Sequence, residues 1–342
     1  MTTFSINQLR LWFGALLIVF FGSGVANSVQ KPALLSALSS KVLLTGSAAL
    51  GHDSGYIAVG LHGHIIRSSN GVSWNQAESP VQILLTNVFF LTPKLGWAVG
   101  HDAVILHTED GGVHWQLQYE DPIPNGDLPK PLLDVYFSDS QHGVAVGAYG
   151  LMLQTADGGK SWSMIQTDSL YDKLEELEME PEPNFNSVIP LEGKLMIAGE
   201  LGTLLVFDPE AKEEETRWQV LNSPYEGTFF GAQVFDKAGI YIYGLRGNIY
   251  NSKDFGESWV KIETDILTSV YDCVELANGK IVFVGSGGTI ITLDPLDNSI
   301  KKHPYPGFDS FMSVEVSNTN DLLLFGSKGV KKININIEGP TL

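Results

Sequence analysis

Three aspartates recur in a repeated turn and are the first residues that could do chemistry. They lie in "TEDGGVHW" (108–115), "TADGGKSW" (155–162) and "SKDFGESW" (252–259), while "SSNGVSW" (68–74) has asparagine instead. Such carboxylates could bind calcium or act as catalytic acids. Because they belong to separate repeats, they cannot surround one point. The pattern therefore predicts a structural role, in which the carboxylate accepts bonds from its own turn and the tryptophan packs on neighbouring strands. The residues given this role are Asn70, Trp74, Asp110, Trp115, Asp157, Trp162, Asp254 and Trp259.

Histidines offer a second kind of chemistry. His62, His64 and His101 come from adjacent repeats, and imidazole is a common metal ligand. His64 begins a strand and is expected to point away from His62, and no cysteine or acid completes the set. We therefore predict no metal and no cofactor. Cys273 is the one cysteine, so we expect no internal disulfide and a buried apolar role for this side chain.

A repeated unit must position these residues. Seven apolar runs end in glycine, and six continue as Gly-x-x-Gly; the second unit has Ala103 in the last place. The leading glycines stand 40 to 52 residues apart, at Gly60, Gly100, Gly147, Gly199, Gly244, Gly285 and Gly326. Each unit reads as four strand-length runs, as in residues 132–138, 144–147, 151–156 and 162–167. This period predicts an all-β, seven-bladed propeller of four-stranded antiparallel blades.

The blade boundaries follow from the repeats. We expect blades at about 41–80, 84–121, 131–168, 185–222, 226–263, 268–305 and 308–337. The seventh unit lacks a fourth strand before the chain ends, and an open sheet edge invites aggregation. Residues 32–38, "PALLSAL", are predicted to supply that strand and close the ring, so that the propeller spans 31–337.

The aspartate turns and the Gly-x-x-Gly runs together resemble the photosystem II stability and assembly factor family. The resemblance covers about residues 41–336 and is strongest in "AVGAYGLMLQTADGGKSW" (145–162) and "YGLRGNIYNSKDFGESW" (243–259). It implies a lumenal or periplasmic seven-bladed propeller that acts as a non-catalytic chaperone for newly made membrane subunits. Photosynthetic members share an arginine-rich surface patch. Here the arginines after residue 26 are Arg67, Arg217 and Arg246, on three different blades.

The repeated aspartate turn is known as an Asp-box. Propellers with Asp-boxes also include sialidases and other glycoside hydrolases, which define the alternative function. A sialidase clamps a carboxylate with three arginines, and the three arginines of this chain are not expected to meet. Other hydrolases need two facing carboxylates. The sequence shows no such pair, and a carbohydrate-active or glycan-binding propeller stays open as the alternative.

The N-terminus and the charge bear on location and partners. Arg10, the apolar run 11–21 and the small residues 22–26 predict a signal peptide over 1–26, cleaved after Ala26. A retained anchor is the alternative, and no cysteine follows the run to carry a lipid. The formal net charge of −18 excludes nucleic acid as a partner. We expect an exported or periplasmic monomer that is not inserted in a membrane once the signal is removed.

One face of the ring is the predicted docking surface for a protein client. Turns between second and third strands share that face with the links between blades, where propeller ligands gather. The residues expected there are His62, His101, Asp102, Tyr149, Glu200, Tyr225, Phe230, Arg246, Phe308 and Lys328. The acidic link 167–184 is expected to form a helix that rests Leu170, Leu174 and Leu177 on the propeller rim and stops at Pro181; an arm for a basic partner is the other interpretation.

Overall fold

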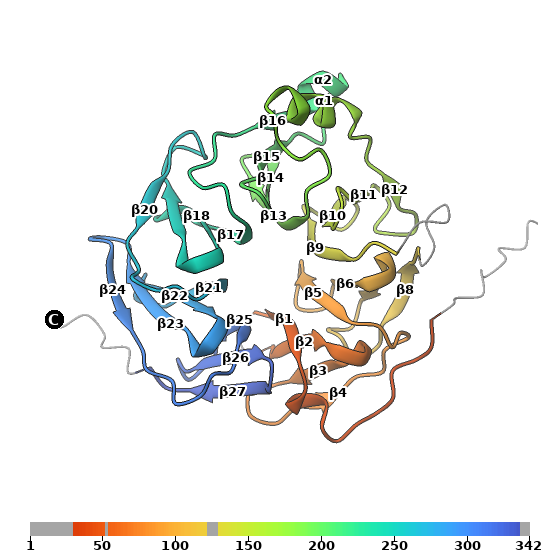
Figure 1. The fold of residues 1–342 in the computed structure, drawn as a ribbon. Helices are drawn as coiled ribbons and strands as arrows, with labels where there is room; N and C mark the ends of the chain where they lie inside the picture. Colours follow the sequence, from red (N-terminus) through yellow and green to blue (C-terminus); the bar gives the residue numbers. More distant parts are fainter. Residues whose placement is uncertain (1–29, 52–53, 122–128, 336–342) are drawn as a thin grey trace, which may run out of the picture.

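Seven antiparallel sheets surround a central axis, as a seven-bladed propeller requires (Figure 1). The computed structural model describes residues 30–51, 54–121 and 129–335. The predicted signal peptide and its cleavage site lie outside these residues. Within them, no helix is long and apolar enough to cross a membrane.

The first four blades each contain four strands in sequence order from the axis outward. Their bounds are β1 (Leu44–Ala49), β2 (Tyr56–Gly60), β3 (Ile65–Ser68), β4 (Asn75–Gln76); β5 (Leu85–Phe90), β6 (Gly96–Gly100), β7 (Ile105–Thr108), β8 (Gln116–Tyr119); β9 (Leu132–Phe137), β10 (Gly143–Gly147), β11 (Met152–Thr155), β12 (Ser163–Met164); β13 (Phe185–Leu191), β14 (Lys194–Gly199), β15 (Leu204–Phe207) and β16 (Trp218–Val220).

The last three blades follow the same order, and two short helices lie on the rim of the fourth blade. The bounds are β17 (Phe229–Phe235), β18 (Gly239–Gly244), β19 (Ile249–Ser252), β20 (Val260–Ile262); β21 (Val270–Glu275), β22 (Ile281–Gly285), β23 (Ile290–Asp294), β24 (Ser299–Lys302); β25 (Phe311–Val316), β26 (Leu322–Gly326), β27 (Gly329–Ile333); α1 (Asp168–Glu176) and α2 (Glu214–Arg217). The all-β seven-bladed propeller predicted from the repeats is confirmed.

Apolar side chains pack between blades. Each neighbouring pair of blades shares one buried cluster, including the pair formed by the last and first blades. There Leu44 and Tyr56 pack with Leu323 and Phe325, and the Tyr56 hydroxyl donates to Asn318 Oδ1 at 3.1 Å. Second strands are buried along their whole length because both of their faces meet a neighbouring blade, as β6, β10 and β22 illustrate. The ring is therefore closed by core packing.

The prediction that residues 32–38 form the fourth strand of blade seven is wrong. Blade seven has three strands, and residues 32–38 form no strand. They run along the outside of the first blade instead (Figure 1), where Ser36 N donates to Gln76 Oε1 at 2.8 Å and Ala33 N to Ser79 O at 2.9 Å. The next residues do reach blade seven, since η1 (Ser39–Lys41) packs near β27 and leaves no room for a Cβ on Gly329. The link before β1 thus adds contacts between blades one and seven to this core packing.

The Gly-x-x-Gly turns need glycine for two different reasons. The first glycine is extended rather than left-handed, with φ 175° at Gly60, and a Cβ there would overlap the carbonyl oxygen of Leu43. The last glycine is left-handed, with φ 70° at Gly63. Between them lies a 3-10 turn, for example η2 (Leu61–Gly63), η3 (His101–Ala103) and η5 (Leu245–Gly247).

Candidate functional site

The turn tips on the predicted docking face have a left-handed backbone, and the side chains of His62, Tyr149 and Arg246 are exposed while Asp102 is half-buried. The third residue of the turn is left-handed in His62 (φ 61°), Asp102 (φ 55°), Tyr149 (φ 54°) and Arg246 (φ 57°). For residues other than glycine this conformation costs free energy, and it persists only where the surrounding structure imposes it. Such strain concentrates at functional positions. In blade four the equivalent residue is Leu201 (φ 52°), one position after the predicted Glu200. Tyr149 is 58% exposed and Leu201 54% exposed.

The other predicted docking residues differ in how exposed they are and in the bonds they make. Phe308 lies in a link and is 93% exposed. Lys328 Nζ pairs with Asp309 Oδ1 at 2.7 Å, and Glu200 accepts bonds from Asn184. Tyr225 is half-buried against Phe229 and Tyr250, so it supports the fold.

Phe230 lies nearer the axis of the ring than the turn tips do. It is in β17 and lines the central cavity, with its ring 5.1 Å from that of Tyr271. The exposed His101 precedes its turn tip by one residue.

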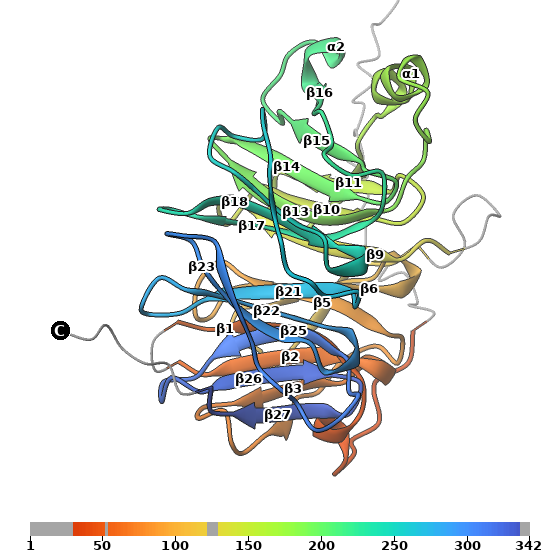
Figure 2. The same ribbon diagram turned by 60° about the vertical axis from the view of Figure 1, so that its left-hand side comes forward.

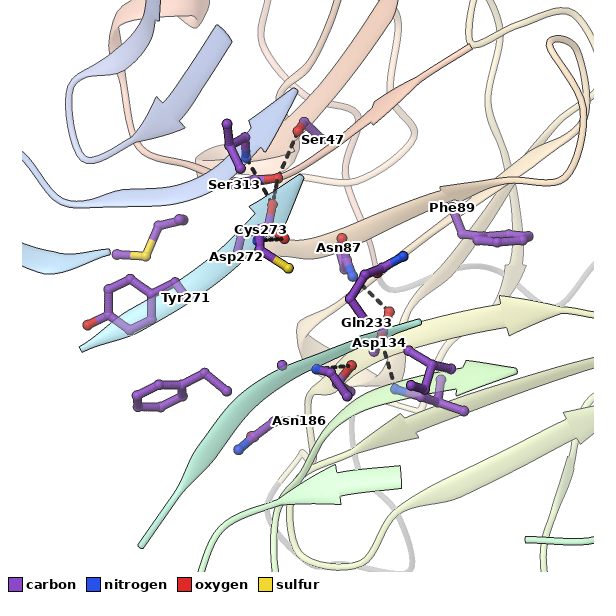
Figure 3. Close-up of a pocket in the computed structure, with 18 of the residues that line it drawn as sticks. Ser47, Asn87, Phe89, Asp134, Asn186, Gln233, Tyr271, Asp272, Cys273 and Ser313 are labelled. Carbon is purple, nitrogen blue, oxygen red and sulfur yellow. Dashed lines mark hydrogen bonds between the residues drawn. The ribbon is translucent and has the colours of Figure 1, made fainter. Parts of the chain in front are cut away.

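A central cavity of about 750 Å³ runs between the innermost strands of all seven blades. Figure 3 shows Tyr271 and Asn186 toward one end, Phe89 toward the other, and a polar middle that includes Asp272, Ser47, Ser313, Asn87 and Asp134. The sequence interpretation did not find this cavity. Its polar residues share one structural feature, a register shift near the start of each inner strand, as at Asp272 in β21 and Ser313 in β25.

Side chains at this register shift tie each blade to the next. On one side of the cavity, Thr86 Oγ1 donates to Leu132 O at 2.6 Å and Asn87 Nδ2 to Asp134 Oδ1 at 2.7 Å, which joins blades two and three. Asp134 Oδ2 then accepts from Val188 N in blade four at 2.8 Å. Asn186 Nδ2 donates to Phe229 O in blade five at 2.7 Å.

The other side of the cavity continues the same ring of bonds. Asp272 Oδ2 accepts from Ser313 Oγ at 2.8 Å and from Val314 N at 2.9 Å, joining blades six and seven. Ser313 Oγ lies 2.7 Å from Ser47 Oγ, which donates to Glu315 Oε1 at 3.3 Å, and this chain joins blade seven to blade one. In blade five the residue at the register shift is Gly231, and the ring of Tyr243 lies over it. The Tyr243 side chain also forms a hydrogen bond with Asp272 of blade six.

Burial perturbs every acid in this ring. Desolvation raises the pKa of Asp134 and of Asp272 from 3.8 to about 6, against the lowering effect of their hydrogen bonds. Desolvation and the charge of Asp272 raise the pKa of Glu315 from 4.5 to about 8, so it holds a proton at neutral pH. Burial also raises the pKa of the Cys273 thiol well above its usual value, which disfavours a nucleophilic thiolate.

The repeated aspartate turns have uniform bonding at the outer edge. In blade three, Asp157 Oδ1 accepts from Ser161 N at 2.9 Å and from Thr155 Oγ1 at 2.8 Å, while Gly159 N donates to Thr155 Oγ1 at 2.9 Å. Asp110 and Asp254 repeat this bonding, and Asn70 accepts from Val72 N and Ser73 N. Hydrogen bonds lower the pKa of Asp157 and Asp254 to about 2.

The closing tryptophans lie against neighbouring core residues. Trp115 packs edge-on to Phe90, Trp162 to Phe137 and Trp74 to Phe325. Trp259 contacts the cluster between blades four and five.

The histidines and arginines do not converge. The rings of His62 and His64 are 6.0 Å apart, and burial, followed by the nearby His62, lowers the pKa of His64. Within the part of the chain that the structure describes, no group of three or more metal-ligating side chains could hold a metal ion. Arg67 lies in β3, Arg217 in α2 and Arg246 in η5, on three blades. A sialidase-type arginine clamp is therefore absent from the described residues.

The acidic link forms the short helix α1 on the rim of the propeller (Figure 2). Leu170 and Leu174 are buried in the cluster between blades three and four, whereas Leu177 is 57% exposed. The helix ends at Glu176, before the prolines. Lys173 Nζ donates to Trp218 O at 2.8 Å, which fixes the helix to blade four.

The fold and the cavity define a class: a seven-bladed propeller whose interior acids are engaged in bonds between blades. The family described as "Photosynthesis system II assembly factor YCF48" matches residues 66–128 and 123–322. This chain belongs to that family.

Curated relatives carry the same family name. The photosystem II assembly lipoprotein Ycf48 of Synechococcus sp. (strain CC9902) is 31% identical over 253 residues, which is 72% of this chain and 58% of the relative. The photosystem II assembly protein Ycf48 of Synechococcus sp. (strain JA-2-3B'a(2-13)) is 45% identical over 49 residues, 14% of this chain and 15% of the relative. The matches thus span less than two thirds of these relatives.

Solved structures agree in fold. "YCF48 bound to D1 peptide" has a TM-score of 0.65 at 15% identity, covering 91% of this chain and 96% of that one. "YCF48 from Cyanidioschyzon merolae" has a TM-score of 0.68 at 15% identity, covering 90% and 99%. "Streptogramin B lyase structure" reaches 0.68 at 12% identity, covering 88% and 95%. Because an enzyme shares the fold equally well, the fold alone does not decide the function.

Proposed function

We propose that this protein is an exported, monomeric and non-enzymatic propeller that holds a protein client while a membrane complex is assembled or operates. Membership of the assembly-factor family supports the proposal, as does the solved relative described as bound to a D1 peptide. A curated relative named as a lipoprotein supports export.

The observation that carries the proposal is the row of left-handed turn tips on the docking face. Turns between second and third strands of neighbouring blades lie on the same face of a propeller. There the side chains of Tyr149, Arg246 and Phe308 are exposed, and a strained exposed tip repeated over several blades serves contact with a partner better than it serves the core.

The interior acids support a non-enzymatic role because their oxygens are already engaged. A catalytic carboxylate must contact the substrate. Both oxygens of Asp134 and of Asp272 instead accept hydrogen bonds from backbone or side-chain groups of inner strands.

A carbohydrate-active propeller remains the second candidate, and one observation favours it. The cavity contains Asp272 and Glu315 from adjacent blades, together with the neighbouring rings of Phe89 and Tyr136, 5.3 Å apart. A protonated Glu315 could act as a general acid. Turnover in a panel of glycosides that is lost in Glu315→Gln would replace our proposal with this candidate.

Site-specific photo-crosslinking in the cells that make the protein tests the docking face. A benzoylphenylalanine placed at Tyr149 or at Phe308 is expected to give adducts with the same membrane protein. The same group at Val260, which is 59% exposed on an outer strand, is the matched control and should not. Adducts that are the same at all three positions, or none at the two face positions, would contradict the proposal.

A further inference from the structure

The central cavity has an unbalanced set of charges. Its lining includes the carboxyl groups of Asp134, Asp272, Glu275 and Glu315. Among the described residues that line it, none is lysine, arginine or histidine. With pKa values of about 6, the two aspartates are ionised at neutral pH, and a cavity with low-dielectric walls concentrates their field.

One mouth of this cavity is apolar. Four of the inner strands place an apolar or aromatic residue just before the register shift: Leu133, Phe230, Tyr271 and Met312. All four are half-buried, and the strand positions put them at the end that adjoins the links and the turn tips. A ligand entering from the docking face would meet these side chains before it meets the carboxyl groups.

We propose that a lysine or arginine side chain of the client enters this cavity, with a neighbouring apolar side chain of the client on the mouth formed by Leu133, Phe230, Tyr271 and Met312. The inference rests on the proposed function and specifies the chemistry of the client segment. Charge complementarity selects a cation, and the apolar mouth suits the methylene stem of a long basic side chain.

The bonding in the cavity indicates where the cation would lie. Asp134 and Asp272 are already engaged by several short bonds, whereas the bond from Ser47 Oγ to Glu315 Oε1 is 3.3 Å long. Glu315 and the ionised Asp272 belong to one chain of contacts through Ser47 and Ser313. Burial first and then the charge of Asp272 disfavour ionisation of Glu315, and an ammonium or guanidinium group beside the two carboxyl groups would offset both effects.

Gln233 allows a test that leaves the bonds between blades intact. It lines the cavity from β17 and is exposed. In Gln233→Lys the new lysine would place its ammonium group in the cavity that the four carboxyl groups line. In Gln233→Met a side chain of similar length carries no charge.

The experiment is isothermal titration of the full chain with acetyl-Phe-Lys-Leu-amide and with its norleucine analogue, which lacks the ammonium. We expect the lysine peptide to bind at least about tenfold more tightly than the analogue. We expect Gln233→Lys to weaken that binding about tenfold without lowering the melting temperature, and Gln233→Met to bind like the wild type. Spermidine serves as the free-cation probe and should bind more weakly than the peptide.

Three outcomes would overturn the inference: equal affinity for lysine and norleucine peptides, equal affinity for spermidine and the lysine peptide, or no binding of any probe. None of these three outcomes affects the result of the crosslinking test at Tyr149 and Phe308. If the crosslinks form while the peptide fails, the client docks on the face but does not insert a cation.

Discussion

Aspartates at the centre and at the edge of this propeller do related jobs under opposite conditions. At the edge, Asp157 and Asp254 accept bonds from their own exposed turns, and their pKa falls to about 2. At the centre, Asp134 and Asp272 accept bonds from the next blade, and burial raises their pKa to about 6. Hydrogen-bond donors alone therefore do not set the pKa of a carboxyl group, because burial away from water decides whether that pKa rises or falls.

The same comparison separates local from long-range structure. An edge aspartate closes a turn within a few residues, such as Asp157 with Ser161. A central aspartate joins residues some forty positions apart, such as Asp272 with Val314. The central bonds therefore connect neighbouring blades, while the edge bonds shape single hairpins.

The largest effect is expected when a central carboxylate is removed. Asp272→Ala leaves the Val314 and Cys273 N–H groups and the Ser313 hydroxyl without their acceptor in a buried region. We expect a loss of about 2–4 kcal/mol in the free energy of unfolding, measured by chemical denaturation. Asp157→Ala is the matched edge control and should lose clearly less. Equal losses would remove the distinction between centre and edge.

A smaller effect concerns pH and Glu315. Its folded pKa of about 8 lies above the ordinary 4.5, so its ionisation opposes folding. The contribution of Glu315 to stability should thus be fully present below about pH 4.5 and be lost as the pH rises toward 8. One pKa unit corresponds to about 1.4 kcal/mol, or roughly 2 °C in Tm for a chain of this size.

Glu315→Gln isolates this contribution. The variant cannot ionise at that position, so its melting temperature should fall less than that of the wild type between pH 5 and 8. Thermal unfolding over that range measures the difference. Parallel pH profiles for the two proteins would show that Glu315 is not perturbed in the folded state.

The smallest effect is expected for Asp254→Asn at the edge. The first turn already has Asn70, whose Oδ1 accepts the two backbone bonds. At pH 7 the melting temperature should change by no more than about 1 °C. As the pH falls from about 4 toward 2, the wild type should lose the stability that its carboxylate gives, because its pKa is lowered to about 2, and its melting temperature should fall below that of the variant, which has no carboxylate there. A large loss at pH 7 would indicate that the charge itself holds the turn.

The repeats predicted the fold because glycines and tryptophans recur at fixed offsets for local reasons. A Cβ at Gly60 would overlap Leu43 O, and Gly63 needs a left-handed backbone, so the same residues return in nearly every blade. The turn tips at His62, Asp102, Tyr149 and Arg246 could be found from the same pattern.

The wrong and missing parts depend on contacts between distant residues. Residues 32–38 have the apolar pattern of a strand, but polar contacts with Gln76, Ser79 and Gln82 hold them on blade one. The polar residues of the cavity had a signal in the sequence, since Asn87, Asp134 and Asp272 each precede the leading glycine of their unit by the same distance. That alignment shows a shared position, but only the closed ring brings the side chains to one cavity.

If interior acids tie neighbouring blades, Asp272 and Ser313 should be energetically coupled, and a double-mutant cycle on this pair measures that coupling. The Asp272→Ala, Ser313→Ala and double variants, measured by urea denaturation, should give a coupling energy of about 1 kcal/mol or more. The cycle of Asp134→Ala with Ser313→Ala joins no common bond and should be additive. Additivity of Asp272 and Ser313 within about 0.3 kcal/mol would contradict this expectation.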